Sequence, residues 1–506
     1  MAERPEPVRD LDWSAERGRG FVDATADIWQ EVLAGMRERP VASRITAEQV
    51  RDAVAIPVPD EPMAEADVIA YLREVALTWS MYPGHPGFMA YVSGAGTVPG
   101  SAADLLASGL NMNPGGWLLG PAATEIELHL CRWFAREVFG LGPAAGGELT
   151  SGGAMATMIG LKVARDQRAG WDVRREGVAA GPPLGLYMST ETHVVSDRAA
   201  DTLGLGAANV RHIAVDGGYR MRVDELRAQI ARDREAGIHP IAVVGTAGTV
   251  STGAIDPLDD LAQVCADEGL WLHVDAAYGG PAMLADDLRP QLAGIERADS
   301  VAFDPHKWLY TPHSGGCLLV RDMEVLRESF DAYAAYTVQD KDATGHGIDL
   351  GRYGPSFSRG FWSLRVWVSL LAHGRDAYAR RISHDAALAR YLGARVEERD
   401  DFELCAPVGL SIACFRFVPP GLPADLDTDE RDTYLSALNQ RIMTGIQLDG
   451  RVFCSNAILE GRFTLRVCIV NFRTEADEMD LVLDVAAELG TQLDREMRPS
   501  LVGRPA

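Results

Sequence analysis

The 506-residue sequence contains very little lysine. Lysine occurs only at Lys162, Lys307 and Lys341, although lysine and arginine together number 48, so arginine occupies every other basic position. Arginine remains protonated in proteins and cannot replace an amine that must lose its proton to react. Any chemistry that requires a lysine amine therefore has three candidate residues.

The chain also lacks an excess of positive charge, clustered cysteines and long apolar runs. Its 72 acidic residues outnumber the basic ones and give a net charge of -24, which disfavours nucleic acid and anionic membranes as partners. The seven cysteines are scattered, with neither a CxxC pair nor metal-ligand spacing, so we expect reduced thiols in a cytoplasmic protein and predict no metal site. No signal peptide and no bilayer-spanning apolar stretch is recognisable.

The length exceeds that of one hydrophobic core and predicts three parts. These are a helical, dimer-forming N-terminal segment over 1–92, a large domain over 93–370 and a small C-terminal domain over 371–506. In the large domain, short apolar runs alternate with amphipathic helices, which predicts a mostly parallel sheet covered on both faces. The runs are 186–189, 210–215, 241–244, 270–274, 301–303 and 317–320.

The small domain is predicted to be α+β. Helices are expected over 377–398 and 475–497, with strands over 411–417 and 463–470 between them. The stretch 419–432, rich in proline, aspartate and threonine, is expected to be a surface loop.

Polar residues stand where several of the predicted strands end, and ligands bind outside the carboxyl ends of parallel strands. Asp275 follows one strand, and Lys307 follows the next in the segment VAFDPHKWLY, together with Asp304 and His306. His193 follows a third strand, and the glycines of LTSGGAMATMIGL stand at the start of a helix. These residues are expected to meet at one edge of the sheet.

Each of these residues has a structural explanation when taken alone. Lys307 could extend its stem over apolar neighbours into water, Asp275 could cap a turn, and His193 could be an ordinary loop histidine. Together, an amine, a carboxylate, a histidine and a glycine-led helix start are the parts needed to hold pyridoxal phosphate. The amine forms a Schiff base, the carboxylate keeps the pyridine nitrogen protonated, and the helix start binds phosphate through free N–H groups.

The motifs HVDAAYGG and DPHKW, with TSGG upstream and a histidine between, resemble the group II pyridoxal-phosphate decarboxylases. This family includes aromatic-L-amino-acid, tyrosine, tryptophan, glutamate and diaminobutyrate decarboxylases, and the match extends over about 85–473. The resemblance implies an aspartate-aminotransferase-like fold of type I, an amino-acid substrate, and a homodimer with active sites at the subunit interface.

The resemblance also implies roles for individual residues. Lys307 would form the Schiff base and Asp275 would pair with the pyridinium, while Ala277 and His193 would lie on the two ring faces. Lys307, His193 and Asp275 are thus the expected catalytic residues. Phosphate and other cofactor contacts are expected from Gly153, Ala154, His306, Thr246 and Thr249.

The expected substrate pocket departs from that of the aromatic-amino-acid decarboxylases. Its members would be Tyr91, Val92, Asn113, Trp117, Phe357 and Arg466. Val92 and Gly94 stand where those enzymes carry an aromatic residue and a threonine. Asn113 and Gly115 stand where those enzymes carry bulkier, apolar residues. We therefore expect a substrate side chain that is neither catechol-like nor indole-like. Ala154 and Met155 replace a frequent Ser-Glu pair, which leaves the phosphate more dependent on backbone contacts.

The proton donor is the remaining departure. Relatives carry a loop tyrosine that protonates the substrate carbon after CO2 leaves, and counting back from Arg359 places Leu350 at that position. Other candidates in or beside the loop near 332–350 are Tyr333, Tyr336, His346 and Tyr353.

The expected reaction is decarboxylation of an L-amino acid to the amine and CO2. The alternatives are decarboxylation coupled to oxidative deamination, which gives an aldehyde, or another fold-type I reaction such as aminotransfer. A non-catalytic scaffold is disfavoured, because it has no use for a buried amine beside a carboxylate.

Overall fold

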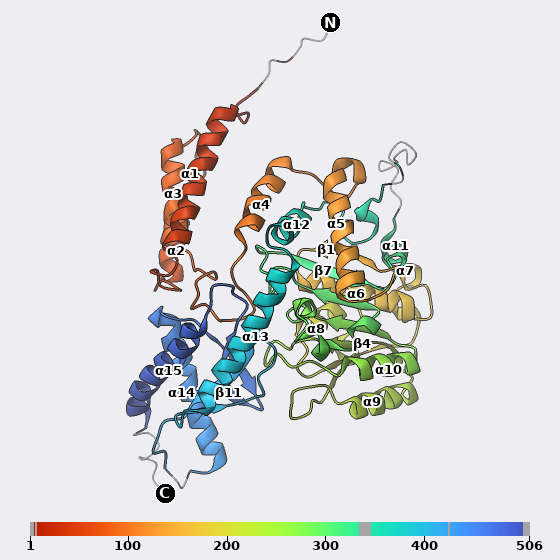
Figure 1. Ribbon diagram of the computed structural model, residues 1–506. Coiled ribbons are helices and arrows are strands. Elements are labelled where there is room, and N and C mark those ends of the chain that lie inside the picture. The colour runs from red at the N-terminus through yellow and green to blue at the C-terminus, as the bar shows by residue number, and fades with distance from the viewer. Residues whose placement is uncertain (1–4, 6–7, 333–344, 346, 424–425, 499–506) are drawn as a thin grey trace.

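The computed structural model describes residues 5, 8–332, 345, 347–423 and 426–498 (Figure 1). Lys341, Tyr333, Tyr336 and His346 lie outside the described residues. The chain forms a pair of long N-terminal helices, a large domain built on a seven-stranded sheet, and a small domain built on a four-stranded sheet.

The large sheet has the strand order β1-β7-β6-β5-β4-β2-β3. Only β7 runs antiparallel to its neighbours, so the predicted mostly parallel sheet is confirmed. All six predicted runs form strands, whereas β1 was not predicted because its sequence GGELT has no apolar run. The strands are β1 Gly146–Thr150, β2 Leu184–Ser189, β3 Val210–Ile213, β4 His239–Thr246, β5 Trp271–Asp275, β6 Ser300–Phe303 and β7 Gly316–Val320.

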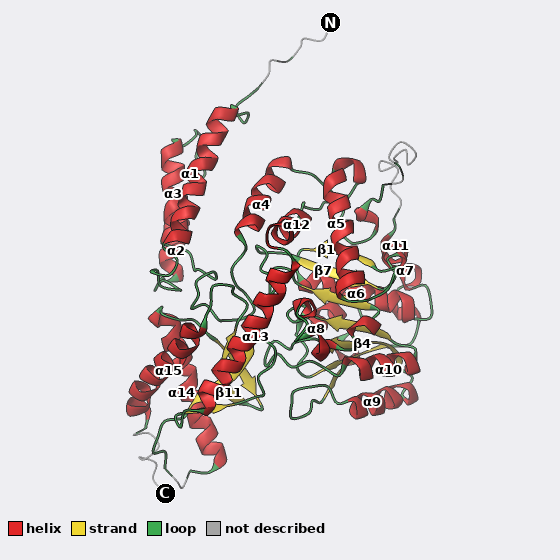
Figure 2. Cartoon of the chain, viewed as in Figure 1, coloured by secondary structure: helices red, strands yellow, loops and turns green. Residues whose placement is uncertain are grey.

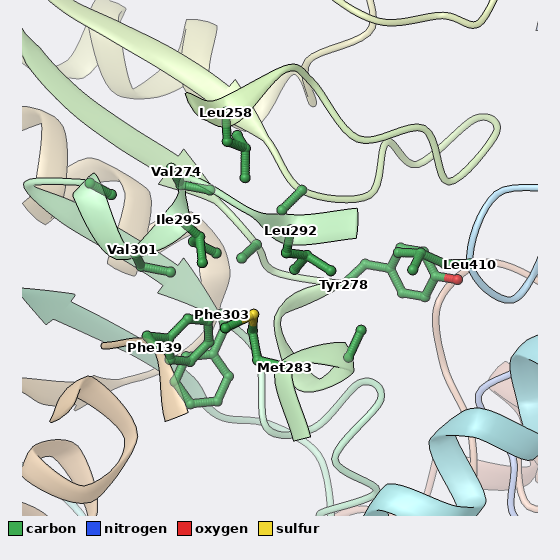
Figure 3. Packing of buried hydrophobic residues seen from close by; sticks show 14 of the residues in the cluster. Phe139, Leu258, Val274, Tyr278, Met283, Leu292, Ile295, Val301, Phe303 and Leu410 are labelled. Atoms are coloured by element: carbon green, nitrogen blue, oxygen red, sulfur yellow. The ribbon is translucent and has the colours of Figure 1, made fainter. Parts of the chain in front are cut away.

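Helices cover both faces of this sheet (Figure 2). Leu186 and Met188 of β2 belong to one apolar cluster and Tyr187 to another, because alternate side chains of a strand point to opposite faces. On one face Val274, Val301 and Phe303 pack with residues such as Ile295 (Figure 3). The helices of this region are α5 Pro121–Trp133, α6 Gly153–Arg168, α7 Val173–Glu176, α8 Val195–Thr202, α9 Val223–Glu235, α10 Leu258–Glu268 and α11 Glu324–Phe330.

The small domain has an antiparallel sheet of order β10-β11-β9-β8 with three long helices. The predicted loop 419–432 is wrong at its end, because α14 begins at Thr428, where Asp427 caps the helix by accepting from the N–H of Glu430. The elements are β8 Phe402–Leu404, β9 Ile412–Phe417, β10 Ser455–Leu459, β11 Arg462–Cys468, α13 Arg375–Glu397, α14 Thr428–Asp449 and α15 Ala476–Met497.

The N-terminal helices α1 (Ala15–Ala34) and α3 (Glu65–Leu77) pack against each other and project from the rest of the molecule, with α2 (Ala47–Val54) near their base (Figure 1). Helix α4 (Val98–Leu110) instead packs on α12 (Ser363–His373) beside the large domain. Within the described residues, no helix combines the length and apolar character needed to cross a bilayer.

Candidate active site

A cavity of about 380 Å³ opens where the parallel strands end. Asp275 is the last residue of β5, Lys307 lies in the turn after β6, His193 follows β2, and Gly153 begins α6. All four line the cavity, together with Ala277 and Ala154. The predicted amine, carboxylate, histidine and helix start thus meet at one edge of the sheet, as expected from their places after its strands.

Lys307 has an ionic partner inside the cavity. Its Nζ lies 2.8 Å from Oδ2 of Asp304, and the two side chains are 23% and 2% exposed. Burial lowers the pKa of Lys307, but attraction to Asp304 and Asp275 outweighs it and the net pKa is raised. The amine of Lys162 is held elsewhere by Asp166, at 2.6 Å. Lys307 is therefore the lysine that faces this cavity within the described part of the chain.

Asp275 and His193 are both oriented by the backbone. Oδ1 of Asp275 accepts a hydrogen bond from the N–H of Ala277 at 3.0 Å, and Nδ1 of His193 accepts from that of Val195 at 3.2 Å. Burial lowers the pKa of His193, and although Asp275 opposes this effect the net direction is downward. The imidazole is thus held neutral at neutral pH, which suits a side chain that lies against an aromatic ring.

The start of α6 suits a phosphate. Its N-cap residue Gly152 supplies no side-chain cap, and its carbonyl accepts from the N–H groups of Met155 and Ala156. The N–H groups of Gly153 and Ala154 and the positive end of the helix dipole remain for an anion. A Cβ at Gly153 would lie only 2.7 Å from Oδ2 of Asp304, so the close approach requires glycine. With the amine of Lys307 and the carboxylate of Asp275 in the same cavity, the residues present fit pyridoxal phosphate.

Two of the expected cofactor contacts lie outside the cavity lining. Nδ1 of His306 lies 2.6 Å from the carbonyl of Gly315, and the ring packs edge-on against His313. Thr249 is buried in a turn, with its hydroxyl 3.0 Å from that of Thr252. Thr246, at the end of β4, does line the cavity. The roles of His306 and Thr249 therefore stay predictions without a contact to this cavity.

The expected substrate pocket divides into two groups. Tyr91, Val92 and Arg466 line the cavity, whereas Asn113, Trp117 and Phe357 do not. Asn113 instead lines a separate cavity of about 720 Å³. The N–H of Trp117 donates to Asp349, and that of Arg359 donates to Oδ1 of Asn113. Asn113 and Trp117 thus lie beside the segment 347–359, which contains Phe357.

Arg466 of β11 is buried at the edge of the cavity with one free donor. Its Nη1 donates to the carbonyl of Tyr91 at 2.9 Å and its Nε to that of Ser251 at 3.2 Å. Its Nη2 is buried without a hydrogen-bond partner among the described residues. A buried guanidinium N–H without a hydrogen-bond partner is suited to bind a carboxylate oxygen.

Leu350 is fully buried in a short helical turn, Leu350–Arg352, and does not line the cavity of its own chain. The turn is held by the N–H of Gly351, which donates to the carbonyl of Gly115 at 2.9 Å. Tyr353 follows this turn and is partly buried, which raises its pKa. The identity of the proton donor stays a prediction.

A buried ionic cluster anchors the chain that follows this turn. Nη1 of Arg359 lies 2.5 Å from Oε2 of Glu148 on β1, and Nη2 pairs with Glu127 on α5. One oxygen of each carboxylate and Nε of Arg359 have no partner within the described chain. Burial, together with the charge of Glu127, raises the pKa of Glu148 to about 7 although Arg359 opposes the change. Two carboxylates therefore share one guanidinium, and Glu148 takes up a proton as the pH falls through about 7.

Two buried hydrogen-bonded joints connect the part of the large domain around Lys307 and Asp275 to the small domain. Oδ2 of Asp385 on α13 accepts from Nε1 of Trp308 at 3.0 Å and from the hydroxyl of Tyr310 at 2.7 Å. The hydroxyls of Tyr278 and Ser411 lie 2.5 Å apart. The residues that flank Lys307 and follow Asp275 are thus fixed to the second domain.

Several cavity residues were not assigned by the sequence. Asp304 was noted at the end of its strand but given no role. Ser455, Asn456 and Ala457 belong to β10, which was not predicted, and nothing local in the sequence places this strand of the small sheet at the cavity. The other unassigned lining residues are Thr157, Val195, Gly248, Val250, Ser251 and Tyr278.

Comparison with known proteins gives a consistent set of similarities. The family model described as the pyridoxal-dependent decarboxylase conserved domain matches residues 48–418. An aromatic-L-amino-acid decarboxylase of Bacillus atrophaeus is 33% identical over 471 residues, covering 93% of this chain and 95% of the relative. A phenylacetaldehyde synthase of a Rosa hybrid cultivar is 27% identical over 467 residues, covering 91% and 90%. The crystal structure of Oryza sativa TDC with PLP and tryptamine superposes with a TM-score of 0.88 at 26% identity, covering 95% of this chain and 99% of that chain.

Proposed function

The chain belongs to the pyridoxal-dependent decarboxylase family, and from this premise we propose that Lys307 is the residue that attaches the cofactor in this enzyme. The protein is a fold-type I, pyridoxal-phosphate-dependent carboxy-lyase that acts on an amino acid. The single observation that supports the site is the convergence of Lys307, Asp275, His193 and the start of α6 on one cavity.

Bound pyridoxal phosphate supplies an electron sink for the pair left on the substrate α-carbon when CO2 departs. Lys307 would hold the cofactor until the substrate amine replaces it, and Asp275 would keep the ring nitrogen protonated. His193 and Ala277 would cover the two ring faces, and the first turn of α6 would bind the phosphate. Arg466 would bind the substrate carboxylate through its free Nη2 and so orient the bond that breaks.

We propose an amine and CO2 as the products. The alternative is an aldehyde with CO2, ammonia and peroxide, formed with O2 as oxidant. Two observations support the aldehyde-forming reaction as the alternative. Leu350 stands at the expected tyrosine position, and the chain is similar to a phenylacetaldehyde synthase. Measuring amine, aldehyde, CO2 and peroxide together on pooled L-amino acids separates the two outcomes.

We further propose that the enzyme is a homodimer with active sites at the interface. Asn113, Trp117 and Phe357 lie outside the cavity of their own chain, as expected if they complete the site of a second copy. The surface near them exposes apolar side chains on α4, on the turn Trp117–Leu119 and on α12. These are Leu105, Leu106, Leu110, Leu118, Leu119 and Leu371, each at least half exposed.

The three parts 1–92, 93–370 and 371–506 are proposed as the domains. A cytoplasmic location is proposed from cysteine usage, since all seven cysteines are unpaired.

The attachment is tested by borohydride reduction of the protein incubated with pyridoxal phosphate, followed by peptide mapping. We expect a loss of visible absorbance and a reduced adduct on Lys307. Lys162→Arg is the matched control and should retain the adduct, whereas Lys307→Arg should abolish it. Recovery of the adduct on Lys162 or Lys341 would refute the assignment.

A further inference from the structure

Asp304 is the second carboxylate of the cavity, and its surroundings differ from those of Asp275. Its Oδ2 lies 2.8 Å from Nζ of Lys307, and its Oδ1 is buried without a partner among the described residues. Asp275 accepts from the N–H of Ala277 and, within the described chain, forms no ion pair. Asp304 is therefore the carboxylate that compensates the charge of Lys307 in the protein without cofactor.

The start of α6 is the other positive neighbour of Asp304. A Cβ added at Gly153 would lie 2.7 Å from Oδ2 and 3.0 Å from Oδ1, so both oxygens lie against the first residue of a 16-residue helix. A helix N-terminus stabilises a nearby anion. The ammonium of Lys307 and the start of α6 are thus two positive neighbours of the Asp304 carboxylate.

Loading the cofactor removes both sources of stabilisation. The amine of Lys307 must be neutral to act as a nucleophile. The start of α6 is the phosphate-binding element of the proposed site. An ionised Asp304 would then lie beside a phosphate with no cation of its own, and a nearby like charge favours the protonated carboxyl.

We propose that Asp304 accepts from Nζ of Lys307 the proton that the amine loses before it attaches the cofactor, and that Asp304 stays neutral in the loaded enzyme. The proton moves across the 2.8 Å contact from Nζ to Oδ2, leaving a neutral amine and a neutral carboxyl. The amine nitrogen then bonds to the aldehyde carbon, and its two remaining hydrogens leave with the aldehyde oxygen as water. This inference rests on the proposed attachment at Lys307.

Proton transfer from Lys307 to Asp304 predicts a distinctive pH dependence of cofactor capture, because the proton stays within these two side chains. Capture of the cofactor by the native enzyme then requires no loss of a proton to solvent. In Asp304→Asn, Lys307 must lose its proton to solvent, so the capture rate follows the fraction of neutral amine. The other charged groups that act on Lys307 or share its surroundings are present in both proteins; they are Asp275, His193, Arg198, His306 and Cys468. Burial lowers the pKa of His193 and of His306 and Asp304 opposes this, so its removal lowers both pKa values further and keeps both imidazoles neutral above about pH 7.

The experiment measures the capture rate of pyridoxal phosphate by stopped-flow absorbance between about pH 6 and about pH 9. We expect the ratio of the Asp304→Asn rate to the native rate to rise about tenfold per pH unit below the lysine pKa. Asp275→Asn is the matched control, because it removes a cavity carboxylate but keeps the acceptor, and its ratio should remain nearly constant. An Asp304→Asn ratio that does not change with pH would overturn the proposal.

A second measurement uses the native chain and does not depend on the folding of the variant. The infrared difference spectrum of loaded minus cofactor-free protein should gain one protonated-carboxyl band, and no gain would overturn the proposal. In a folded Asp304→Asn protein that band should be absent, and its persistence would assign the proton to another carboxyl. Failure of the native chain to capture the cofactor at all would instead refute the proposed function.

Discussion

Asp275 has one carboxylate oxygen held by the N–H of Ala277 and lines the cavity with the rest of its side chain. This geometry supports the proposed role of Asp275 as the partner of a ring nitrogen, beside its role as the cap of its turn. Asn has the same shape and can keep the turn, but it carries no charge. Asp275→Asn therefore separates the electrostatic role from the structural one.

In Asp275→Asn we expect Lys307 to remain trappable by borohydride while kcat falls about 10²–10³-fold, because the protonated ring nitrogen loses its anion. Steady-state CO2 release and the reduced adduct, measured on the same preparation, check this. Turnover close to that of the native enzyme would show that Asp275 only caps its turn.

Arg466 can be tested with a neighbour on the same strand. Arg466→Gln removes the free Nη2, and since a hydrogen bond to a charged group contributes about 1.5–3 kcal/mol, kcat/KM should fall about 10–100-fold, mainly through KM. Arg462→Gln removes an arginine that pairs with Glu460 at the surface, and it should change KM less than about twofold. An unchanged KM in Arg466→Gln would show that this arginine only binds the backbone carbonyls of Tyr91 and Ser251.

At the scale of elements, the strands that the sequence predicted are those with continuous apolar runs, such as β4 and β5. Strand β1 was missed because Glu148 is buried by an ionic partner, Arg359, that lies 211 residues further along the chain. Helix α14 (Thr428–Asp449) was not predicted, and its first residues were assigned to a loop because local proline and aspartate residues suggested one. Its buried face, formed by Leu435, Leu438 and Ile442, becomes evident only against the small sheet.

The same distinction applies to the site. Lys307, Asp275 and His193 could be predicted because each follows a recognisable strand of one sheet. Ser455 and Asn456 could not, because the strand that carries them belongs to the other domain and reaches the cavity only through the tertiary fold.

The Arg359 cluster predicts a pH dependence of stability. Glu148 has an unfolded pKa near 4.5 and a folded pKa of about 7, so the folded protein retains a proton that the unfolded chain releases. Its contribution to stability is present below about pH 4.5 and is lost as pH rises through about 7, amounting to up to about 3 kcal/mol. Glu148→Gln cannot titrate and should show a flatter profile of the free energy of unfolding over this range.

Denaturant unfolding at several pH values measures that profile. Glu403→Gln is the matched control: Glu403 also shares an arginine, Arg416, with a second carboxylate, Asp432, but it is partly exposed. It should keep the native pH dependence. Parallel profiles for Glu148→Gln and the native protein would show that the proton lies elsewhere.

At the scale of the whole molecule, the exposed leucines of α4 predict assembly. Leu106→Glu places a charge on the proposed interface and should shift the protein from dimer to monomer in sedimentation, with loss of activity. Leu448→Glu changes an equally exposed leucine, 52% against 56%, on α14 away from this surface, and should leave the dimer intact. A native protein that sediments as a monomer would refute the proposed assembly.

The joints made by Asp385 and by the Tyr278–Ser411 pair bear on how the molecule melts. One apolar cluster contains residues of both domains, such as Phe303 and Ile412, but each domain has its own sheet, which would ordinarily permit two separate transitions. Unfolding the small domain alone, however, would strip Trp308, Tyr310 and Tyr278 of their buried partners, at a cost of about 1–3 kcal/mol for each group left unsatisfied. Scanning calorimetry should therefore record a single heat-absorption peak, with the two domains behaving as one cooperative unit.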